Sequence, residues 1–437
     1  MELPIVASKI AAIVDPGEMA PMFVASFHSR GYDCMIIQTS PDGVDSVDGL
    51  ADFHGLDNLR RLDRSDRAAQ GEPERPPIAL RHTSIERTLS LIAAYDVRCV
   101  IAGTESGVNL ADRLSESLGL LTNGTALTNA RRNKCLMIEA VRSHGLAVPA
   151  QVCSDRINEL IDWVRLRATW PVVIKPPDST SSEGVGLCAS EHALRQAFEN
   201  IKNRRNRLGS FNETAVVQEF VDGTEYIVDT VSHAGRHKAA AFWRYGKPES
   251  RPAGFIGYDS MELLPFEGPT QAVLFHYATG VLDALGIRYG PAHCELILSD
   301  KGPLLVEVGA RPNGGKNALV AELCTGSAQI TETINAYLEP DKFIADLQQP
   351  YRLHQNATIV FLVPERLGVL RALGPVAEIE ALPSFHELLI GVKVGEPLTR
   401  VAGVVTLIHP DNAVIQRDLC RIRQIEANGF YQITPAT

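Results

Sequence analysis

The sequence predicts an α/β protein, and three observations lead to this prediction. Segments typical of strands and helices alternate from the amino terminus, with a strand at 5–15, a helix at 18–29 and a strand at 32–39. Later in the chain, acidic residues alternate with apolar ones, which is the two-residue period of a β-strand. Hydrophobic residues make up 45% of the 437 residues and charged residues 22%, a balance that favours large buried sheets over disorder. Such a length exceeds one hydrophobic core, so we expect roughly two to four lobes.

The amino-terminal elements continue the α/β pattern. We predict a helix at 84–95, a strand at 98–102 and a helix at 108–118. The last of these helices has one apolar stripe, formed by Val108, Ala111, Leu114 and Leu118. A polar stretch at 57–77 interrupts the pattern, and we expect a surface insertion there because it offers nothing to bury.

The loop from Gly103 to Gly107 follows the strand at 98–102, at the edge where open α/β sheets bind ligands. Glu105 in this loop either faces a substrate or stabilises the amino terminus of the next helix, and the sequence leaves both interpretations open. No Gly-x-Gly-x-x-Gly pattern follows the first strand, which disfavours a dehydrogenase.

The segment from His293 to Gly315 is the most informative part of the chain. Glu295 and Glu307 lie on two predicted strands joined by a turn at 299–303, and the two-residue period directs both carboxylates to one face. Mg²⁺ takes carboxylate oxygens from a protein when substrate phosphates complete its coordination shell. The hairpin therefore predicts a magnesium site, with Arg311 just beyond it as an anion-binding side chain.

Two further residues on the first of these strands are chemically active types. His293 shares the face of Glu295, where it either supports the site or acts in catalysis. Cys294 faces the opposite side and is predicted to be a buried structural thiol.

Two upstream segments are suited to binding a nucleotide. A predicted strand ends at Lys175 and is followed by prolines and small polar residues, so that backbone N–H groups near Gly184 and Gly186 can close over phosphates. Lys175 adds a flexible positive charge for the same phosphates. The segment 216–229 is predicted to form two strands with a short connector, whose backbone suits adenine, while Glu225 suits ribose hydroxyls.

The remaining elements are predicted more coarsely. We expect one helix from Ala130 to the stop at His144 and Gly145, with Lys134 near its first turn. Further helices are predicted at 191–208, as a basic solvated helix, and at 270–285. After Pro340 we predict another α/β piece with strands at 357–363, 377–381 and 401–408.

Charge and cysteine usage exclude several classes of protein. The net charge of −10 disfavours a nucleic-acid-binding protein, which needs a basic surface. The eight cysteines include no Cys-x-x-Cys pair, and we therefore predict reduced thiols and a cytoplasmic location. No signal-peptide pattern opens the chain and no long apolar run occurs, so secretion and membrane insertion are not expected.

The residues singled out above occur in an order and spacing that resembles the ATP-grasp superfamily over roughly residues 1–437: Lys134, Lys175, the connector from Gln218 to Glu225, Glu295, Glu307 and Arg311. Within that superfamily the chain looks most like the carboxylate-amine ligases, the L-amino acid ligase group. The piece after residue 340 is similar to the small closing subdomain of that group.

The resemblance implies a domain organisation. A Rossmann-like pre-ATP-grasp domain is expected at 1–120, and a central ATP-grasp subdomain with the phosphate loop at 121–205. The carboxy-terminal ATP-grasp lobe, with the metal and substrate site, is expected at 206–345, followed by the closing subdomain at 346–437.

The resemblance also implies roles for particular residues. Those expected to bind ATP are Lys134, Lys175, Ser181, Ser182, Gly184, Val185, Gln218, Glu219, Val221 and Glu225. Glu295 and Glu307 are expected to hold Mg²⁺, or Mn²⁺ in its place. Those expected to contact the substrates are Arg311, Gly314, Gly315 and Tyr258, and those expected to act in catalysis are Arg311, His293 and Lys175. The region 240–262 borders the acceptor site in this family, which makes Trp243, Arg244, Tyr245, Lys247 and Tyr258 candidates for specificity.

Two positions depart from the family pattern. Gly309 stands where many ATP-grasp enzymes have an asparagine two residues after the second acid, which puts a two-metal site in doubt. Ser181 stands where the phosphate loop often has glycine, and a serine adopts a positive φ less readily, so the loop is expected to be stiffer.

The function implied by the resemblance is ATP-dependent ligation of a carboxylate to an amine through an acyl phosphate, giving ADP and phosphate. The expected partners are a small carboxylic acid or amino acid and a second amino acid, and the expected assembly is a homodimer. The alternatives are an ATP-grasp enzyme that uses bicarbonate or formate, and an ATP-binding regulator without turnover.

Overall fold

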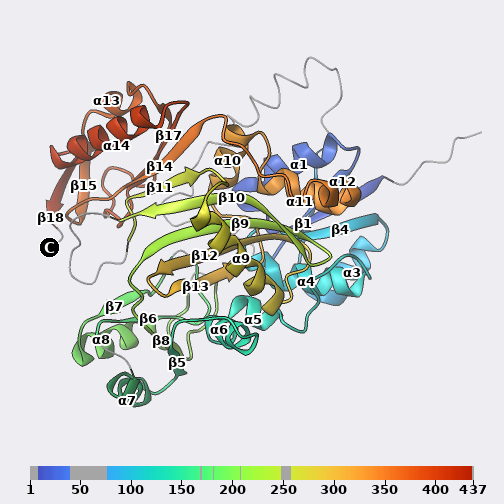
Figure 1. The fold of residues 1–437 in the computed structure, drawn as a ribbon, viewed down its shortest axis with the longest axis horizontal. Helices are drawn as coiled ribbons and strands as arrows, with labels where there is room; N and C mark the ends of the chain where they lie inside the picture. The colour runs from blue at the N-terminus through green and yellow to red at the C-terminus, as the bar shows by residue number, and fades with distance from the viewer. Residues whose placement is uncertain are drawn as a thin grey trace, which may run out of the picture.

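The computed structural model describes residues 8–39, 76–167, 170–180, 182–206, 208–247 and 257–435. The predicted insertion at 57–77 lies almost wholly outside these residues. Within the described part, a parallel sheet, a small antiparallel sheet and a long antiparallel sheet carry the fold, together with a two-stranded ribbon (Figure 1).

The amino-terminal sheet has the order β3-β2-β1-β4 and is parallel throughout. Its strands are β1 Lys9–Val14, β2 Asp33–Gln38, β3 Ile78–Arg81 and β4 Asp96–Ala102. Its helices are α1 Ala20–His28, α3 Ile85–Ile92 and α4 Val108–Ser117. In β1, Ala11 and Ile13 pack with Phe23 and Phe27 of α1, whereas Ile10, Ala12 and Val14 pack in the cluster that contains α4. Helices therefore cover both faces, which confirms the predicted α/β beginning.

The small sheet has the order β5-β8-β6-β7 and is antiparallel. It consists of β5 Gln151–Ser154, β6 Val172–Lys175, β7 Gly186–Cys188 and β8 Ala215–Glu219, covered by α7 Ile157–Arg167 and α8 Glu191–Ile201. The prediction of one helix at 191–208 was wrong, because α8 ends at Ile201, its last buried apolar residue, and the basic stretch beyond it has none to bury. The lobe boundary that we propose at residue 205 falls before β8, although β8 pairs with β5 and β6.

The helix predicted from Ala130 is two helices, α5 Thr128–Arg132 and α6 Lys134–Ser143. Asn133 between them has an extended backbone, and its side chain accepts hydrogen bonds from the N–H groups of Cys135 and Leu136. Asparagine is a preferred residue at a helix amino terminus because it caps otherwise unpaired N–H groups. The break makes Lys134 the first residue of α6.

The long sheet has the order β13-β12-β9-β10-β11-β14-β17-β16, and its neighbouring strands are antiparallel. Its strands are β9 Thr224–His233, β10 Arg236–Gly246, β11 Ser260–Leu264, β12 Gly290–Ser299, β13 Gly302–Gly309, β14 Asn356–Leu362, β16 Phe385–Ile390 and β17 Gly403–His409. Helix α9 Pro269–Ala284 packs against one face and α10 Asn317–Thr325 against the other. Helices α11 Gln329–Leu338 and α12 Pro340–Ala345 follow α10.

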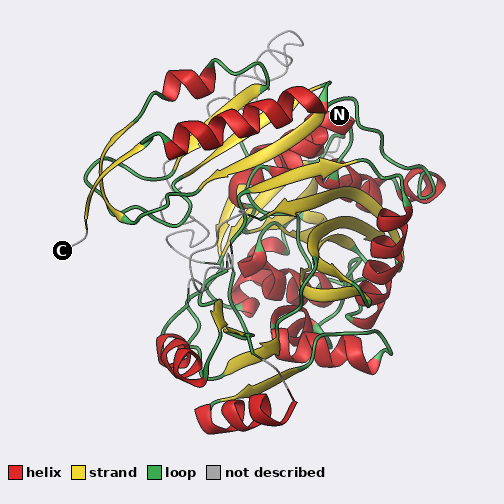
Figure 2. Ribbon diagram, turned by 60° about the vertical axis from the view of Figure 1, so that its left-hand side comes forward, coloured by secondary structure: helices red, strands yellow, loops and turns green. Residues whose placement is uncertain are grey.

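The carboxy-terminal part extends the long sheet rather than building a separate one, since β14 pairs with β11. It adds the ribbon of β15 Gly368–Leu373 and β18 Tyr431–Pro435, and the helices α13 Val376–Glu380 and α14 Asn412–Ala427. Figure 2 shows these two helices side by side on the outer face of this part. The strand predicted at 377–381 was wrong: the segment is α13, in which Ile379 is buried and Pro375 precedes the first turn.

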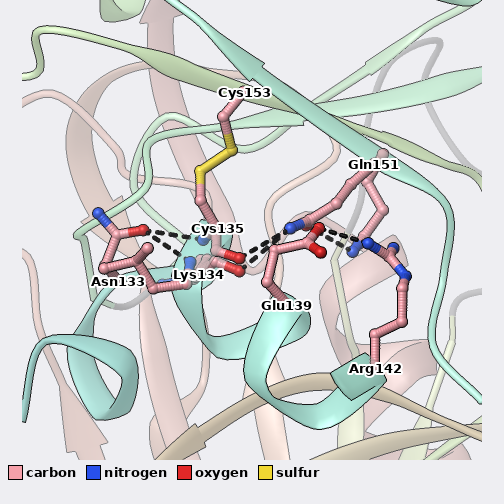
Figure 3. Close-up of a disulfide and its surroundings, with 9 residues drawn as sticks. Asn133, Lys134, Cys135, Glu139, Arg142, Gln151 and Cys153 are labelled. Carbon is pink, nitrogen blue, oxygen red and sulfur yellow. Dashed lines mark hydrogen bonds and ion pairs between the residues drawn. A yellow bond between two sulfur atoms is a disulfide. The ribbon is translucent and has the colours of Figure 1, made fainter. Parts of the chain in front are cut away.

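Two cysteines contradict the prediction of reduced thiols. Cys135 at the start of α6 and Cys153 in β5 form a disulfide, whereas the other six cysteines are free. Gln151 in β5 also donates to the carbonyl of Cys135, so β5 is joined to the first turn of α6 twice (Figure 3). The pair lies 18 residues apart without a recognisable spacing, and only the packing of β5 beside α6 brings it together.

None of the helices described is long and apolar enough to cross a membrane.

Candidate functional site

The register of β9, β12 and β13 places five chemically active side chains on one face of the long sheet. Glu295 is opposite Glu307, as the sequence predicts, and His293 is opposite Asp229. Residues two apart on a strand share a face, so Glu225 and Asp229 of β9 lie on the same side as His293 and Glu295 of β12. The residues between them, such as Cys294, belong to the hydrophobic core on the other side.

Two lysines reach this face from other elements. Lys134 of α6 places Nζ 2.8 Å from Glu307 Oε2 and donates to the carbonyl of Ser179 at 3.0 Å. Lys175, at the end of β6, donates to Gln218 Oε1 at 3.2 Å and to the carbonyl of Val306 at 3.4 Å. Both lysines are buried. Two positive charges are thus held beside the acidic hairpin.

The predicted phosphate loop lies next to Lys134. The N–H of Lys134 donates to Pro177 O, and the loop continues through two turns to β7. Ser182 and Gly184 both have positive φ values, of 56° and 71°. A Cβ at Gly184 would lie 2.8 Å from a ring carbon of Pro176, so glycine is required there for a second reason. Val185 closes a turn by donating to Ser182 O, and Ser181 lies outside the described residues.

The connector between β8 and β9 is less open than the sequence suggests. Glu219 donates its N–H to Ala150 O and accepts from Ala150 N–H through its carboxylate. Val221 is partly exposed. Glu225 is buried and accepts a hydrogen bond from the hydroxyl of Tyr258 at 2.5 Å. Tyr258 stacks on Tyr245 with ring centroids 3.9 Å apart, so this predicted substrate residue contacts the acid predicted to bind ribose.

Arg311 meets an acid from the amino-terminal sheet. Its Nε donates to Glu105 Oε2 at 3.0 Å and its Nη1 to Pro312 O at 2.9 Å. Glu105 lies in the short helix η2 Glu105–Gly107 at the carboxyl end of β4. Of the two interpretations left open for Glu105, its contact with Arg311 supports a position at the substrate site.

A second arginine, Arg132, was not predicted. Its guanidinium lies 3.5 Å from Glu105 Oε1 and 2.9 Å from Asp178 Oδ1 in the phosphate loop. The only sequence signal is its position two residues before Lys134. Arg132 thereby links Glu105 to the predicted phosphate loop.

The missing asparagine at Gly309 has a structural explanation. A Cβ at this position would lie 2.8 Å from Glu105 Oε2 and 3.1 Å from Arg311 Cζ. The ends of the Glu105 and Arg311 side chains therefore occupy this space, and both would have to shift to admit a side chain at 309. Gly314 and Gly315 follow in the exposed loop before α10, and Gly315 has a φ of 62°.

His293 lies between two acids. Its Nδ1 is 2.8 Å from Asp229 Oδ1 and its Nε2 is 3.1 Å from Glu295 Oε1. Burial lowers the pKa of His293, but the hydrogen bonds to both acids outweigh burial and raise it to about 9. A histidine that carries its proton at neutral pH is a poor general base, which favours a supporting role.

Three of the predicted specificity residues make contacts outside the group of acids on β9, β12 and β13 or are buried. Trp243 is fully buried and donates its indole N–H to Asp229 at 3.1 Å, so it lies beneath the site and its prediction as a specificity residue was wrong. Arg244 pairs with Glu262. Lys247 donates to the carbonyl of Gly223 in the connector.

The local charges shift the protonation of the site. Burial raises the pKa of Glu307, but Lys134, Lys175 and Arg311 outweigh burial and lower it to about 2. Burial and the neighbouring Lys134 lower the pKa of Lys175 to about 8. Burial and Glu295 raise the pKa of Glu225 to about 7. Perturbed titratable groups gathered in this way are typical of functional sites.

The donor set fits a hard divalent cation. Glu295 and Glu307 offer carboxylate oxygens from facing positions, which is the chemistry that Mg²⁺ prefers. Among the described residues, no group of three or more histidine, cysteine, aspartate or glutamate side chains is arranged to hold a metal ion. Mg²⁺ commonly takes the rest of its shell from phosphates and water, so two carboxylates are a sufficient protein contribution.

Comparison with known proteins agrees with this geometry. Residues 168–319, which run from β6 through the acidic hairpin into α10, match the family model described as an ATP-grasp domain. The crystal structure of an L-amino acid ligase from Bacillus licheniformis matches with a TM-score of 0.71 and 17% identity, over 99% of this chain and all of the other. The chain has an ATP-grasp fold. Its ATP-grasp fold is the predicted one, and an ATP-grasp domain binds ATP.

Two relatives of this chain are ligases by name. Dapdiamide A synthase from Enterobacter agglomerans is 29% identical over 97% of both chains. An L-arginine-specific L-amino acid ligase from Bacillus subtilis is 20% identical over 66% of this chain and 68% of its own. These relatives group the chain with the ATP-dependent amino-acid ligases of the superfamily, as predicted.

Proposed function

We propose that this protein is an ATP-dependent carboxylate-amine ligase that joins an amino acid or small carboxylic acid to an amino acid through an acyl phosphate. The observation that carries the proposal is the juxtaposition of two half-sites. Glu307 contacts Lys134 on the phosphate side, and Arg311, four residues later, contacts Glu105 on the other side. A carboxylate held by Arg311 would therefore lie beside the terminal phosphate of ATP.

The phosphate side is built for charge neutralisation. Lys134 and Lys175 would bind the ATP phosphates, with the N–H groups near Gly184 above them. Glu295 and Glu307 would hold Mg²⁺, or Mn²⁺, which when bound supplies positive charge to the phosphate oxygens. Gln218, Glu219 and Val221 would line the adenine, and Glu225 the ribose once Tyr258 releases it.

The side of the site around Arg311 suits a substrate carboxylate that later becomes the oxyanion of a tetrahedral intermediate. A substrate carboxylate attacks the γ-phosphate of ATP, ADP leaves, and the amine then attacks the acyl carbon while phosphate departs. The planar guanidinium of Arg311 can hold two oxygens at once, first of the carboxylate and then of the tetrahedral intermediate. Gly314 and Gly315 would offer backbone N–H groups without side chains in the way. His293 is proposed to keep Glu295 in place.

The identity of both substrates belongs to the same proposal. Glu105 can accept from a substrate amino group, which favours an α-amino acid as one partner. Tyr245, Lys247 and Tyr258 remain candidates for reading its side chain. We also propose that the protein works in the cytoplasm as a homodimer.

The test is ADP and phosphate release with Mg²⁺-ATP across a matrix of paired amino acids and small carboxylates, with mass spectrometry of each active mixture. We expect release that requires two partners and a product mass equal to their sum less water. Release with bicarbonate or formate alone would assign the protein to the alternative ATP-grasp chemistry. Binding of Mg²⁺-ATP without turnover in any mixture would instead support a regulator.

A further inference from the structure

One buried carboxylate connects both halves of this site and has no role in the proposed chemistry. Asp229 lies in the middle of β9 and is 1% exposed. It accepts three hydrogen bonds, from His293 Nδ1 at 2.8 Å, Asn313 Nδ2 at 2.9 Å and Trp243 Nε1 at 3.1 Å. Hydrogen bonds to an ionised acceptor are stronger than those between neutral groups, so three of them fix the partners firmly.

The first partner leads to the metal acids. His293 donates from Nδ1 to Asp229, and its other ring nitrogen, Nε2, lies 3.1 Å from Glu295 Oε1. The orientation of the imidazole is therefore set from behind by Asp229. Hydrogen bonds from residues behind a metal site orient the side chains that hold the metal. Asp229 would act in this way on Glu295 through His293.

The second partner leads to the anion-binding arginine. Asn313 is two residues beyond Arg311 and is 3% exposed. Its N–H donates to Gln329 Oε1 at 2.7 Å, and its side-chain oxygen accepts from Asn317 at 2.9 Å. Gln329 in turn donates to Thr230 O and Ala292 O, on β9 and β12. The loop that carries Arg311 is thus fastened to the strands that carry the acids.

The third partner closes the arrangement. Trp243 is fully buried on β10 and packs in the cluster with Ile227 and α10. Its indole N–H donates to Asp229 Oδ2, the oxygen that also accepts from Asn313. The carboxylate therefore cannot rotate without losing a hydrogen bond. A residue with these contacts acts through its neighbours rather than on the substrate.

We propose that Asp229 is a positioning residue that holds the metal acid Glu295, through His293, and the Arg311 loop, through Asn313, in one register. The inference rests on the proposed function. In acyl-phosphate chemistry the phosphate is transferred on the Glu295 side and the oxyanion is stabilised on the Arg311 side, and 1 Å of misplacement is enough to cost about 100-fold in rate. A single carboxylate bonded to both sides would prevent their relative movement.

The test compares Asp229→Asn with the wild-type full chain. The asparagine amide has the shape of the aspartate carboxylate, but its NH₂ group donates where one carboxylate oxygen accepted. This NH₂ group must face an N–H of His293, Asn313 or Trp243, so at least one of the three hydrogen bonds is lost. We expect the Kd of ADP measured without Mg²⁺ to change less than twofold, because Lys134 and Lys175 are untouched. We expect the Mg²⁺-dependent binding of a non-hydrolysable ATP analogue to weaken about tenfold, following the loss expected for an outer-shell partner of a metal site.

Turnover supplies a second readout that a merely structural role would not change. In Asp229→Asn, kcat should fall, and the KM of Mg²⁺-ATP should rise in line with the weaker Mg²⁺-dependent binding of the analogue. The amount of amide formed per ADP should also fall, because a loosened Arg311 exposes the acyl phosphate to water. Asn313→Ala should show this uncoupling without the weakened Mg²⁺-dependent binding, since it breaks only the contact on the Arg311 side.

A matched control separates positioning from stability. Asp418 in α14 is also a buried carboxylate. In the described part of the chain it accepts from Ser384 N–H and Oγ and makes no hydrogen bond or ion pair with the acids, lysines or arginine of the site. Asp418→Asn should lower the melting temperature and leave Mg²⁺-dependent binding and coupling unchanged. The inference is overturned if Asp229→Asn binds the Mg²⁺-ATP analogue like the wild type. The analogue binding needs no acceptor substrate, so this result is distinct from a failure of the ligase function.

Discussion

Single side chains at this site are held by opposite charges that come from different lobes. Arg311 is bonded to Glu105 from the amino-terminal sheet, whereas Lys134 is bonded to Glu307. Removing one partner of a buried pair leaves the other charge uncompensated, which is costly. Variants that test these residues should therefore keep the charge of the side chain, so that the partner is not left unpaired.

Arg311→Lys keeps the positive charge but loses the planar fork that can hold two oxygens. We expect kcat to fall about 100- to 1,000-fold, the usual loss for one donor to an oxyanion. The KM of ATP should stay within about threefold, because the phosphates are bound by other residues. Steady-state ADP release measures both constants. A kcat within twofold of the wild type would remove Arg311 from the mechanism.

Lys175 predicts a pH dependence of ATP binding. The pKa of this lysine is lowered to about 8, chiefly by burial, whereas Glu307 outweighs the effect of burial and raises the pKa of Lys134. Above pH 8 the free protein therefore loses the proton of Lys175 while Lys134 keeps its own, and the neutral amine of Lys175 no longer attracts phosphates by charge. We expect the Kd of ATP to rise as the pH increases from about 8 towards 10.

The matched variant for this pH dependence is Lys175→Arg, because arginine stays protonated across the whole range. Calorimetric titration with ATP should give a Kd that is nearly constant between pH 7 and 10 for this variant, and rising for the wild type. Parallel curves for the two proteins would contradict the assignment to Lys175.

At the scale of elements, the predicted hairpin and the observed one agree because β-strands have a simple period. Glu295 and Glu307 face each other across β12 and β13. The helix boundaries were predicted less well, since Asn133 divides one predicted helix and Ile201 ends another early. A single capping residue decides such boundaries, whereas a strand hairpin is specified by many alternating positions.

The disulfide joins α6 to β5 through Cys135, the residue that follows Lys134 (Figure 3). Replacing Cys135 and Cys153 together by serine should lower the free energy of unfolding by about 2–4 kcal/mol, the usual contribution of a disulfide that closes a short loop. Urea unfolding with and without a thiol reductant measures the effect. The wild type should lose stability on reduction, and the double variant should not respond.

The same experiment has a chemical readout. An alkylating agent added to the denatured, non-reduced protein should label six cysteines, the free ones, and two more after reduction. Labelling of all eight without reduction would contradict the disulfide.

At the scale of the whole molecule, three parts of the chain meet at Lys316. This residue lies in the loop between Arg311 and α10, and its Nζ is 2.5 Å from Glu387 Oε1 on β16. The charges of Lys316 and Glu387 also act on Glu18, which lies in the short helix η1 Gly17–Met19. Its pKa is raised by burial, lowered by Lys316 and raised by Glu387. Lys316 therefore links the amino-terminal sheet, the substrate loop and the carboxy-terminal part.

Lys316→Glu should destabilise the protein by about 1–2 kcal/mol, because three carboxylates would then meet. Glu387→Lys in the same chain should recover part of the loss by restoring an opposite pair. A double-mutant cycle in thermal unfolding measures the coupling. Strictly additive single effects would show that the contact does not hold these parts together.

The sequence by itself determined the fold class and the facing acids of the hairpin, because strand period is a local property of the chain. The phosphate-binding roles of both lysines and of the loop to Gly186 remain predictions from the same local pattern. The pairing of Glu105 with Arg311, the place of Arg132 and the three contacts of Asp229 were decided only by the tertiary structure. Each joins residues that are far apart in sequence, and no local pattern encodes which buried donor will meet which acceptor. The same reason explains the disulfide and the burial of Trp243, both of which depend on how strands from different segments pack.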